Sequence, residues 1–410
     1  MTDEAEMPVT GDDSLAKRNA LVLSCAQALY FVGATIQIAL AGLVGNLLAD
    51  DKSLATLPVT AYVLGTLIST VPASLFMRRW GRKAGFTLGA TCGLISSSFA
   101  VYAIFEFDFW MFCLALFFSG GYQAFAQYYR FAAADTASPQ FRPTAISWVL
   151  AGGLVAAIAG PQLVILTKET FAPVMFAGSF LVIAISSIMA FAVLQLIDIP
   201  KAPSTSVDGT PPRSLREILK QKKLKVAIFS GMVSYASMTF VMTATPLAMI
   251  ACNHPVDSAA LAIQWHVLAM FAPSFVTGKL IARFGRENII LAGLVLLAGA
   301  GLIAMSGIAI WQFNMSLILL GVGWNLGYIG STTLVTDCHR PEERNKVQAI
   351  NEFMVFGLVA FASFASGKLL HESGWNTVAV TYMPLVAIAA GLVLMLSLGR
   401  QRSNLTTTGV

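Results

Sequence analysis

The sequence predicts an all-α membrane protein in which twelve transmembrane helices form two six-helix bundles. The first observation is composition, because 56% of the 410 residues are hydrophobic and only 11% are charged, against about 25% charged residues in soluble domains. The second is a series of twelve apolar runs, each of about twenty residues, long enough to cross a bilayer. The third is an internal repeat that relates the second half of the chain to the first.

The repeat is clearest in two pairs of segments. Residues 121–142, GYQAFAQYYRFAAADTASPQFR, return as residues 323–344, GWNLGYIGSTTLVTDCHRPEER, at an offset of 202. Residues 79–82, RWGR, return as residues 283–286, RFGR, at an offset of 204. Two matches at nearly the same spacing indicate that the chain holds two copies of one unit in the same order.

The apolar runs divide the chain into two sets of six. They are expected near 20–48, 55–77, 84–105, 109–134, 144–167 and 171–197, and then near 226–250, 258–281, 288–308, 312–336, 347–369 and 376–398. A Pro-rich and then basic segment separates the sets. We therefore expect an N-terminal tail (1–19), an N-terminal bundle (20–197), a linker (198–225), a C-terminal bundle (226–398) and a C-terminal tail (399–410).

The basic residues predict the orientation of the chain in the membrane. Of the 26 Lys and Arg residues, Lys52, Lys168 and Lys368 fall on one side, and Arg130 and Lys279 lie within or at the ends of spans. All the others fall on the opposite side, which the positive-inside rule assigns to the cytoplasm. Both termini and the linker are therefore expected in the cytoplasm, which requires an even number of spans.

Several classes of function are disfavoured. The N-terminus is acidic and lacks the basic start of a secretory signal, so no cleavage is expected. The five cysteines are scattered without metal-ligand spacing. Neither a zinc-protease, nucleophile-elbow nor P-loop motif is present. No cofactor, metal or nucleic-acid partner is expected, and an intramembrane enzyme or a non-transporting sensor is a remote alternative.

The turn after the second span carries a family motif. Residues 74–83, SLFMRRWGRK, resemble the G-x-L-a-D-R-x-G-R-K motif of the major facilitator superfamily, and residues 278–287, GKLIARFGRE, resemble its second copy. Ser74 stands at the first Gly of the motif, and Arg78 and Ala282 stand at its Asp. The resemblance covers about residues 20–398 and implies two six-helix bundles that alternate in exposing a central substrate site.

The same resemblance implies a conformational latch at the cytoplasmic face. In this family the motif Arg reaches an acid at the end of span 4 or 10. The expected members are Gly81, Arg82, Asp135 and Arg142 in the first copy and Gly285, Arg286, Asp337 and Arg344 in the second. The alternative is that each turn is a plain positive-inside loop.

The resemblance also implies that spans 1, 4, 7 and 10 line the substrate cavity. Polar and aromatic residues near the middle of these spans are therefore the candidate substrate-binding residues, namely Gln37, Tyr122, Gln123, Tyr235, Trp324 and Asn325. Amides are costly in lipid, so they should point inward. Ordinary helix packing for the aromatic residues, and interhelical hydrogen bonds for the amides, are the alternatives.

Three other residues are candidates for proton or charge coupling. Arg130 lies toward the cytoplasmic end of span 4, Glu352 lies just inside span 11, and His266 lies within span 8. Glu352 is the only carboxylate clearly inside a span. The alternatives are a structural ion pair for Arg130, a snorkelling helix-end acid for Glu352 and a hydrogen-bonded packing residue for His266.

The expected site is rich in aromatic and amide groups and has no central carboxylate, which suits a neutral, flat molecule with polar edges. Residues 239–249, 264–275, 321–336 and 340–353 resemble a bacterial subgroup of the superfamily that includes riboflavin uptake transporters. This resemblance implies a monomeric secondary transporter that takes up riboflavin, by symport or uniport, across the bacterial inner membrane. Efflux of drug-like or organic metabolites by proton antiport is the alternative.

Overall fold

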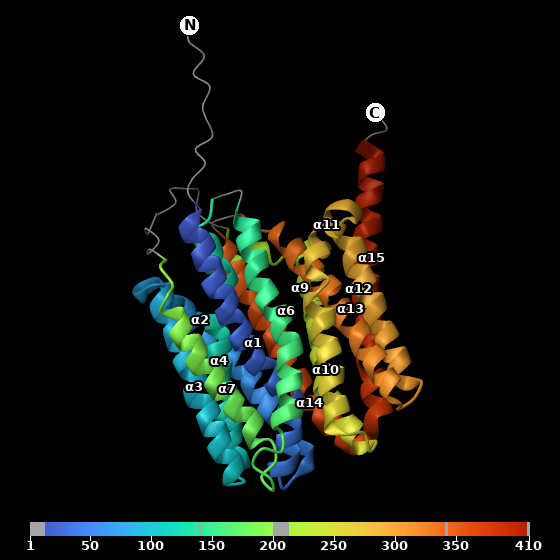
Figure 1. Cartoon of the computed structure of the whole chain (residues 1–410). Helices are drawn as coiled ribbons and strands as arrows, with labels where there is room; N and C mark the ends of the chain where they lie inside the picture. Colours follow the sequence, from blue (N-terminus) through green and yellow to red (C-terminus); the bar gives the residue numbers. More distant parts are fainter. Residues whose placement is uncertain (1–12, 139–140, 200–212, 341–342, 408–410) are drawn as a thin grey trace.

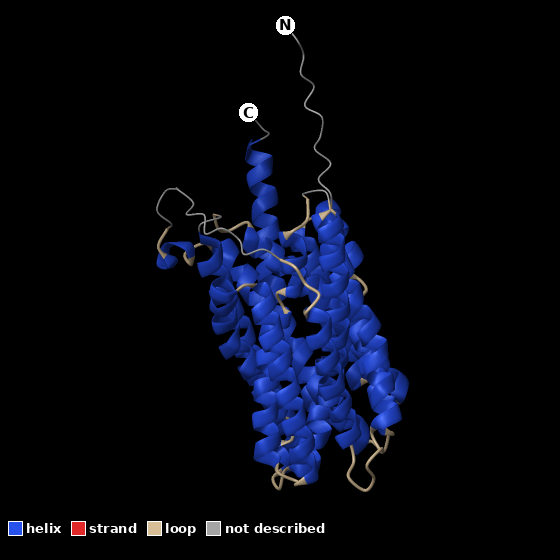
Figure 2. Ribbon diagram, turned by 60° about the vertical axis from the view of Figure 1, so that its left-hand side comes forward, coloured by secondary structure: helices blue, strands red, loops and turns tan. Residues whose placement is uncertain are grey.

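The computed structural model describes residues 13–138, 141–199, 213–340 and 343–407. Within these ranges the chain is helical and has no strand, and short loops join the helices (Figure 2). The predicted all-α fold is therefore confirmed. Parts of the expected tails and linker, residues 1–12, 200–212 and 408–410, lie outside the described residues.

The first half of the chain contains eight helical segments. They are α1 (Ser14–Leu48), the 3-10 helix η1 (Lys52–Leu54), α2 (Leu57–Trp80), α3 (Arg82–Phe105), α4 (Phe109–Ala126), α5 (Tyr129–Asp135), α6 (Arg142–Thr167) and α7 (Ala177–Leu194). Helices α4 and α5 follow one another through Gln127 and Tyr128 and together form the expected fourth span. We call α1 to α7 the N half.

The second half begins with the short helix α8 (Leu215–Ile218). It continues with α9 (Lys222–Ala251), α10 (Val256–Phe271), α11 (Ser274–Phe284), α12 (Arg286–Met305), α13 (Ile310–Thr336), α14 (Arg344–Thr381) and α15 (Met383–Thr407). We call α8 to α15 the C half.

Ten helices in the described residues are long and apolar enough to cross a membrane, or eleven if the bent pair α10 and α11 counts as one span. The longest candidate, Lys346–Leu398, has 53 residues. At 1.5 Å per residue it would be about 80 Å long, far more than the roughly 30 Å hydrocarbon core. It also contains Gly374, whose φ of 76° breaks the helix. Counting it as two crossings gives the expected twelve.

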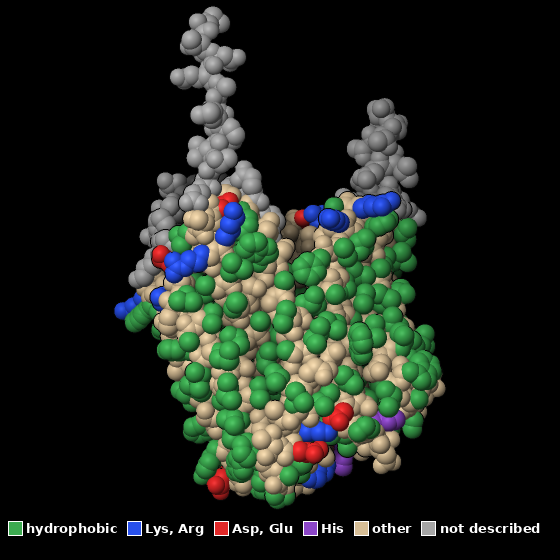
Figure 3. All heavy atoms as spheres, viewed as in Figure 1, with side chains coloured by type: hydrophobic (Ala, Val, Ile, Leu, Met, Phe, Trp, Pro, Cys, Tyr) green, Lys and Arg blue, Asp and Glu red, His purple; other side chains and the backbone are tan. Residues whose placement is uncertain are grey.

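The two halves lie side by side (Figure 1). Helix α6 of the N half packs against α10 of the C half, and α2 packs against α14. Helix α1 begins, and α15 ends, at the same end of the bundle (Figure 1). In Figure 3 most of the visible Lys and Arg side chains lie near that end, and a largely hydrophobic band separates them from charges at the opposite end. We call these the basic end and the far end.

Two glycines form equivalent tight turns at the basic end. Gly81 joins α2 to α3 with φ of 91°, and Gly285 joins α11 to α12 with φ of 84°. Residues with a Cβ rarely adopt such angles, because the Cβ crowds the neighbouring carbonyl oxygen. The two copies of the repeat therefore use glycine in the same way.

Candidate functional site

A cavity of about 260 Å³ lies between the two halves. Its lining comes from α1, α2, α4, α5 and α6 of the N half and from α9, α10, α13 and α14 of the C half. Three of the predicted substrate-binding residues line it: Gln123, Tyr235 and Trp324. A site made by both halves can respond to their relative movement.

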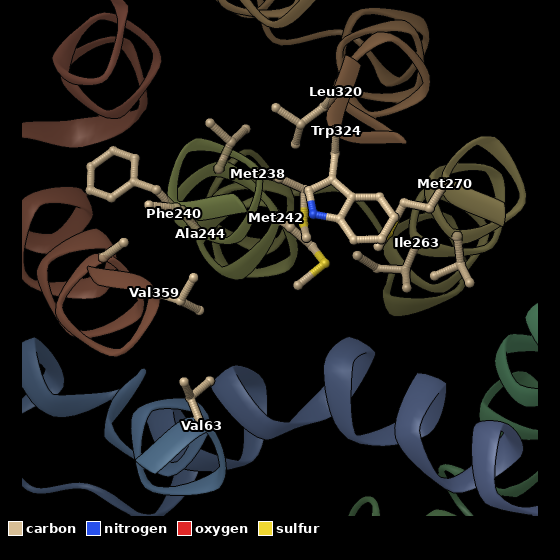
Figure 4. Close-up of a cluster of buried hydrophobic side chains, with 14 of the residues drawn as sticks. Val63, Met238, Phe240, Met242, Ala244, Ile263, Met270, Leu320, Trp324 and Val359 are labelled. Atoms are coloured by element: carbon tan, nitrogen blue, oxygen red, sulfur yellow. The ribbon is translucent and has the colours of Figure 1, made fainter. Parts of the chain in front are cut away.

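The wall from the C half is aromatic. Tyr235 of α9 makes edge contacts with Trp324 and Tyr328 of α13, with ring centroids 5.4 and 5.0 Å apart. Trp324 and Tyr328 stack with centroids 5.4 Å apart and planes inclined by 18°. They face the same side because residues four apart on a helix are neighbours. Figure 4 shows the Trp324 ring between Met242 of α9 and Met270 of α10.

The wall from the N half supplies hydroxyl and amide groups. The hydroxyls of Tyr30 and Tyr62 lie 3.2 Å apart and share a hydrogen bond. The side-chain oxygen of Gln123 accepts a hydrogen bond of 3.0 Å from the Thr66 hydroxyl. Its amide nitrogen has no hydrogen-bond partner in the described part of the chain, so it can donate to a ligand.

The cavity also contains charge. Arg130 of α5 and Glu352 of α14 both contribute to the lining, from opposite halves. The ion pairs found among the described residues do not include either side chain. The expected site had no central carboxylate, and Glu352, which was expected just inside the eleventh span as a candidate for coupling, contributes to the cavity lining from the first part of α14.

Three predicted substrate-binding residues do not line the cavity. The Gln37 amide nitrogen donates to the Ser119 hydroxyl at 2.6 Å and joins α1 to α4. The Tyr122 ring is 4% exposed and packs edge-on against Tyr30, with centroids 5.0 Å apart. These contacts match the packing and interhelical hydrogen bonding that were the alternatives for both residues.

Asn325, the third, holds together a broken span. Its amide nitrogen donates to the Met270 carbonyl and the Ser274 hydroxyl, both at 2.7 Å, and its side-chain oxygen accepts from Thr277 at 2.6 Å. Met270 lies in α10, and Ser274 and Thr277 lie in α11, which is bent from α10 by 42°. All polar atoms of the Asn325 side chain are thus engaged by the protein.

His266 is also outside the cavity lining. It is fully buried in α10, and its Nδ1–H donates to the carbonyl of Leu317 in α13 at 2.7 Å. This contact matches the packing alternative, so among the three coupling candidates only Arg130 and Glu352 reach the cavity.

Several lining residues were not among the predicted site residues. Tyr30, Tyr62, Gln127, Tyr328 and Phe356 all line the cavity. Two of them had a signal in the sequence, because Gln127 follows Gln123 by four residues and Tyr328 follows Trp324 by four residues. Helical spacing places such pairs on one face.

The structure brings together the central residues of the predicted latch. Arg82 forms a 3.1 Å ion pair with Asp135, and Arg286 forms a 2.9 Å ion pair with Asp337. Lys223 is a further partner of Asp337, at 2.8 Å. Each of these pairs lies within one half.

The outer members of the latch lie apart from these pairs. Arg142 donates instead to the Ala137 carbonyl at 3.1 Å. Arg344 begins α14, and its side chain lies outside the described part of the structure.

Polar contacts between the halves close the cavity at the far end. Lys168, which follows α6, forms an ion pair with Asp257 of α10. Gln162 donates to Gln264 at 2.9 Å, and the hydroxyls of Thr60 and Ser363 lie 2.9 Å apart. At the basic end, by contrast, Figure 3 shows the surface hollowed between the two halves. The structure is therefore closed at the far end and open toward the basic end.

The geometry of two helical halves around one cavity agrees with the similarity to known proteins. The family model described as Major Facilitator Superfamily matches residues 23–250 and 227–409. The chain belongs to this superfamily. It is therefore a multi-pass membrane protein of a transporter family, and the resemblance drawn from the turn motifs is confirmed.

Individual relatives extend this comparison. The chain is 49% identical over 380 residues to the riboflavin transporter RfnT of Brucella anthropi, covering 92% of this chain and 95% of that protein. It is 27% identical to the uncharacterized transporter YddS of Bacillus subtilis, covering 82% of each protein. Among solved structures, the nucleoside transporter NupG has the same fold, with a TM-score of 0.70 at 14% identity over 92% of this chain and 98% of that one.

Proposed function

We propose that this protein takes up riboflavin across the bacterial inner membrane, with its basic end in the cytoplasm. The observation that carries the proposal is the 49% identity, along nearly the whole chain, to a protein named as a riboflavin transporter. The excess of Lys and Arg at the basic end supports the orientation. The proposal includes the division into bundles at residues 20–197 and 226–398 and a monomeric transporter.

The chemistry of the cavity supports a flavin as the solute. The ring system of riboflavin is flat, and one of its edges carries carbonyl and imide groups. Trp324, Tyr328 and Tyr235 offer aromatic faces for stacking. The free amide nitrogen of Gln123 offers a hydrogen bond to a carbonyl on that edge.

Alternating access accounts for the uptake mechanism. In the state described here, contacts such as that between Gln162 and Gln264 close the far end. Release of these contacts, together with closure at the basic end, would expose the same cavity to the other side. In this proposal the ion pairs of Arg82 with Asp135 and of Arg286 with Asp337 act as the conformational latch by joining helix ends within each half.

Charge in the cavity provides a candidate for coupling. Glu352 and Arg130 enter it from opposite halves, so protonation of Glu352 would change the attraction between the halves. Uptake by a Glu352→Gln variant is then expected to lose its dependence on external pH. Unchanged pH dependence would remove Glu352 from the coupling mechanism.

Glu352 also favours a second candidate function. A carboxylate beside an aromatic and methionine-rich wall suits an organic cation, so export of drug-like cations by proton exchange is the alternative. In that case the gene would confer resistance to cationic toxins, and Glu352→Gln would abolish that resistance.

Labelled riboflavin uptake separates these functions. The test uses bacteria that neither synthesise nor import riboflavin, with and without this gene. We expect uptake that unlabelled flavins inhibit and unrelated dyes do not. Absence of uptake, with the protein present in the membrane, would overturn the proposal in favour of efflux.

Two glutamines provide a matched pair for locating the site. Gln123→Ala removes an amide that faces the cavity, whereas Gln37→Leu removes an amide that bonds Ser119 away from it. We expect a higher KM for riboflavin only in the Gln123 variant. Equal effects of the two substitutions would contradict the placement of the site.

A further inference from the structure

A second and larger hollow of about 1190 Å³ lies in the C half, apart from the central cavity. Its walls come mainly from α9 and α15, with Met354 of α14 and Glu287 of α12. Most of the lining is apolar, including Phe229, Met232 and Met395. Met395 is 72% exposed, so this wall faces outward rather than into the protein core.

One end of this groove is basic. Lys222, Lys223 and Lys225 lie in the first turn of α9 and contribute to its lining. Lys222 and Lys225 are exposed and have no ion-pair partner among the described residues. Glu287 is the one carboxylate in the described lining, and its side chain is 6% exposed. The accessible charge at this end is therefore positive.

The dimensions of the groove match one leaflet of a membrane. From Lys222 to Met232 the lining follows α9 for about ten residues, which is about 15 Å of helix. Half of the roughly 30 Å hydrocarbon core has the same depth. An acyl chain on the apolar wall would thus place its headgroup level with the lysines.

We propose that this groove binds an anionic phospholipid, with its phosphate at Lys222 and Lys225 and an acyl chain along Phe229, Met232 and Met395. Charge complementarity selects an anionic headgroup, and the exposed apolar wall selects a lipid rather than a soluble phosphate. The site is separate from the central cavity and does not depend on the identity of the transported solute.

Lys223 connects this groove to the latch. It lines the groove and also bonds the Asp337 carboxylate, which Arg286 holds as well. A bound phosphate attracts Lys223 away from Asp337. Lipid composition therefore acts on one of the ion pairs that join the helix ends of the C half.

Native mass spectrometry of the purified full chain tests the proposal. The probes are phosphatidylglycerol, which is anionic, and phosphatidylcholine, which has no net charge. We expect the wild-type protein to retain one phosphatidylglycerol in preference to phosphatidylcholine. The double variant Lys222→Gln/Lys225→Gln should bind phosphatidylglycerol about thirtyfold more weakly, which corresponds to about 1 kcal/mol for each basic residue.

Two controls define the outcome. Lys17→Gln/Lys83→Gln removes the same charge from the basic end of the N half and should leave lipid retention unchanged. Met395→Trp fills the groove without altering charge and should weaken retention of phosphatidylglycerol. Equal retention of the two lipids by the wild type, or equal losses in the two double variants, would overturn the proposal.

Discussion

Asn325 provides the sharpest test of the site geometry. Its side chain makes three hydrogen bonds, to Met270, Ser274 and Thr277, across the bend between α10 and α11. Hydrogen bonds of side chains between membrane helices contribute about 0.6 kcal/mol each on average, with a maximum of about 1.7. Asn325→Ala is therefore expected to destabilise the protein by about 2 kcal/mol and to lower its thermal unfolding midpoint.

The matched variant is Gln123→Ala, at the equivalent position of the other repeat. Gln123 makes one protein hydrogen bond, with Thr66, and its amide nitrogen is available to the solute. Its loss should change stability by less than about 1 kcal/mol but weaken riboflavin binding about twofold to tenfold, the effect of about 0.5–1.5 kcal/mol for one hydrogen bond.

Thermal unfolding of the detergent-solubilised protein and quenching of flavin fluorescence measure these two effects separately. The expected result is a stability defect with near-normal riboflavin binding for Asn325→Ala, and the reverse for Gln123→Ala. If Asn325→Ala were as stable as the wild type yet failed to bind riboflavin, the assignment of Asn325 to a structural role would be refuted.

Four other predictions concern the ends of the helices. Lys168→Gln removes the ion pair with Asp257 at the far end, in which the Lys168 side chain is 14% exposed. The fraction of molecules open at that end should increase about twofold to fivefold, as measured by distances between spin labels on α6 and α10. Because the hydrogen bond to Asp257 raises the pKa of Lys168, the wild-type contact should be complete below the ordinary Lys pKa and be lost only as the pH rises through the raised value. Glu343→Gln should lower the thermal midpoint at pH 7. Arg213 forms a 2.7 Å ion pair with Glu343, and its guanidinium holds the pKa of that carboxyl well below the usual range. The wild-type contribution should therefore be complete above the ordinary Glu pKa and decline only as the pH falls toward the lowered value. If the difference between the midpoints of wild type and variant did not shrink as the pH fell below the ordinary Glu pKa, this linkage would be wrong. Gly285→Ala should cost about 1–3 kcal/mol, because φ of 84° with ψ of 157° is a backbone conformation essentially restricted to glycine. Gly278→Ala, with open space around it, should be neutral in the same unfolding assay. A side chain at Gly367 would clash with Thr56 of the other half, so Gly367→Leu should hold the far end open and reduce riboflavin uptake, while Gly357→Leu, which meets nothing within 4 Å, should not.

Composition and repeats in the sequence were sufficient to predict the helical fold, and the family resemblance of the turn motifs predicted two contacts at the basic end. The repeated RWGR and RFGR segments located the two glycine turns, and the matching acids Asp135 and Asp337 located the partners of Arg82 and Arg286. These contacts are local in each repeat, or link spans whose ends must meet at one membrane surface. The resemblance identified both partners of each pair, whereas it gave no partner for Lys223 or Arg142, and their contacts with Asp337 and the Ala137 carbonyl were not predicted.

The cavity was harder to predict, because depth in the membrane does not determine which way a side chain faces. Successive residues on a helix are rotated by about 100°. Tyr122 and Gln123 are adjacent, as are Trp324 and Asn325, and in each pair one residue lines the cavity while its neighbour packs against the protein. Choosing between them requires knowing which face of each helix points to the cavity. The apolar residues of these spans do not show it, and only the pairs four residues apart, Gln123 with Gln127 and Trp324 with Tyr328, indicated that face.

The different fates of Gln123 and Asn325 have a consequence for how a duplicated protein changes. They occupy equivalent positions of the repeat, yet the Gln123 side chain lines the cavity and the Asn325 amide braces the bend between α10 and α11. In the proposed mechanism the two copies of the repeat therefore have different tasks at this position. Chimeras that exchange halves with a related transporter should accordingly carry hydrogen-bonding preference with the N half and preference for ring shape with the C half.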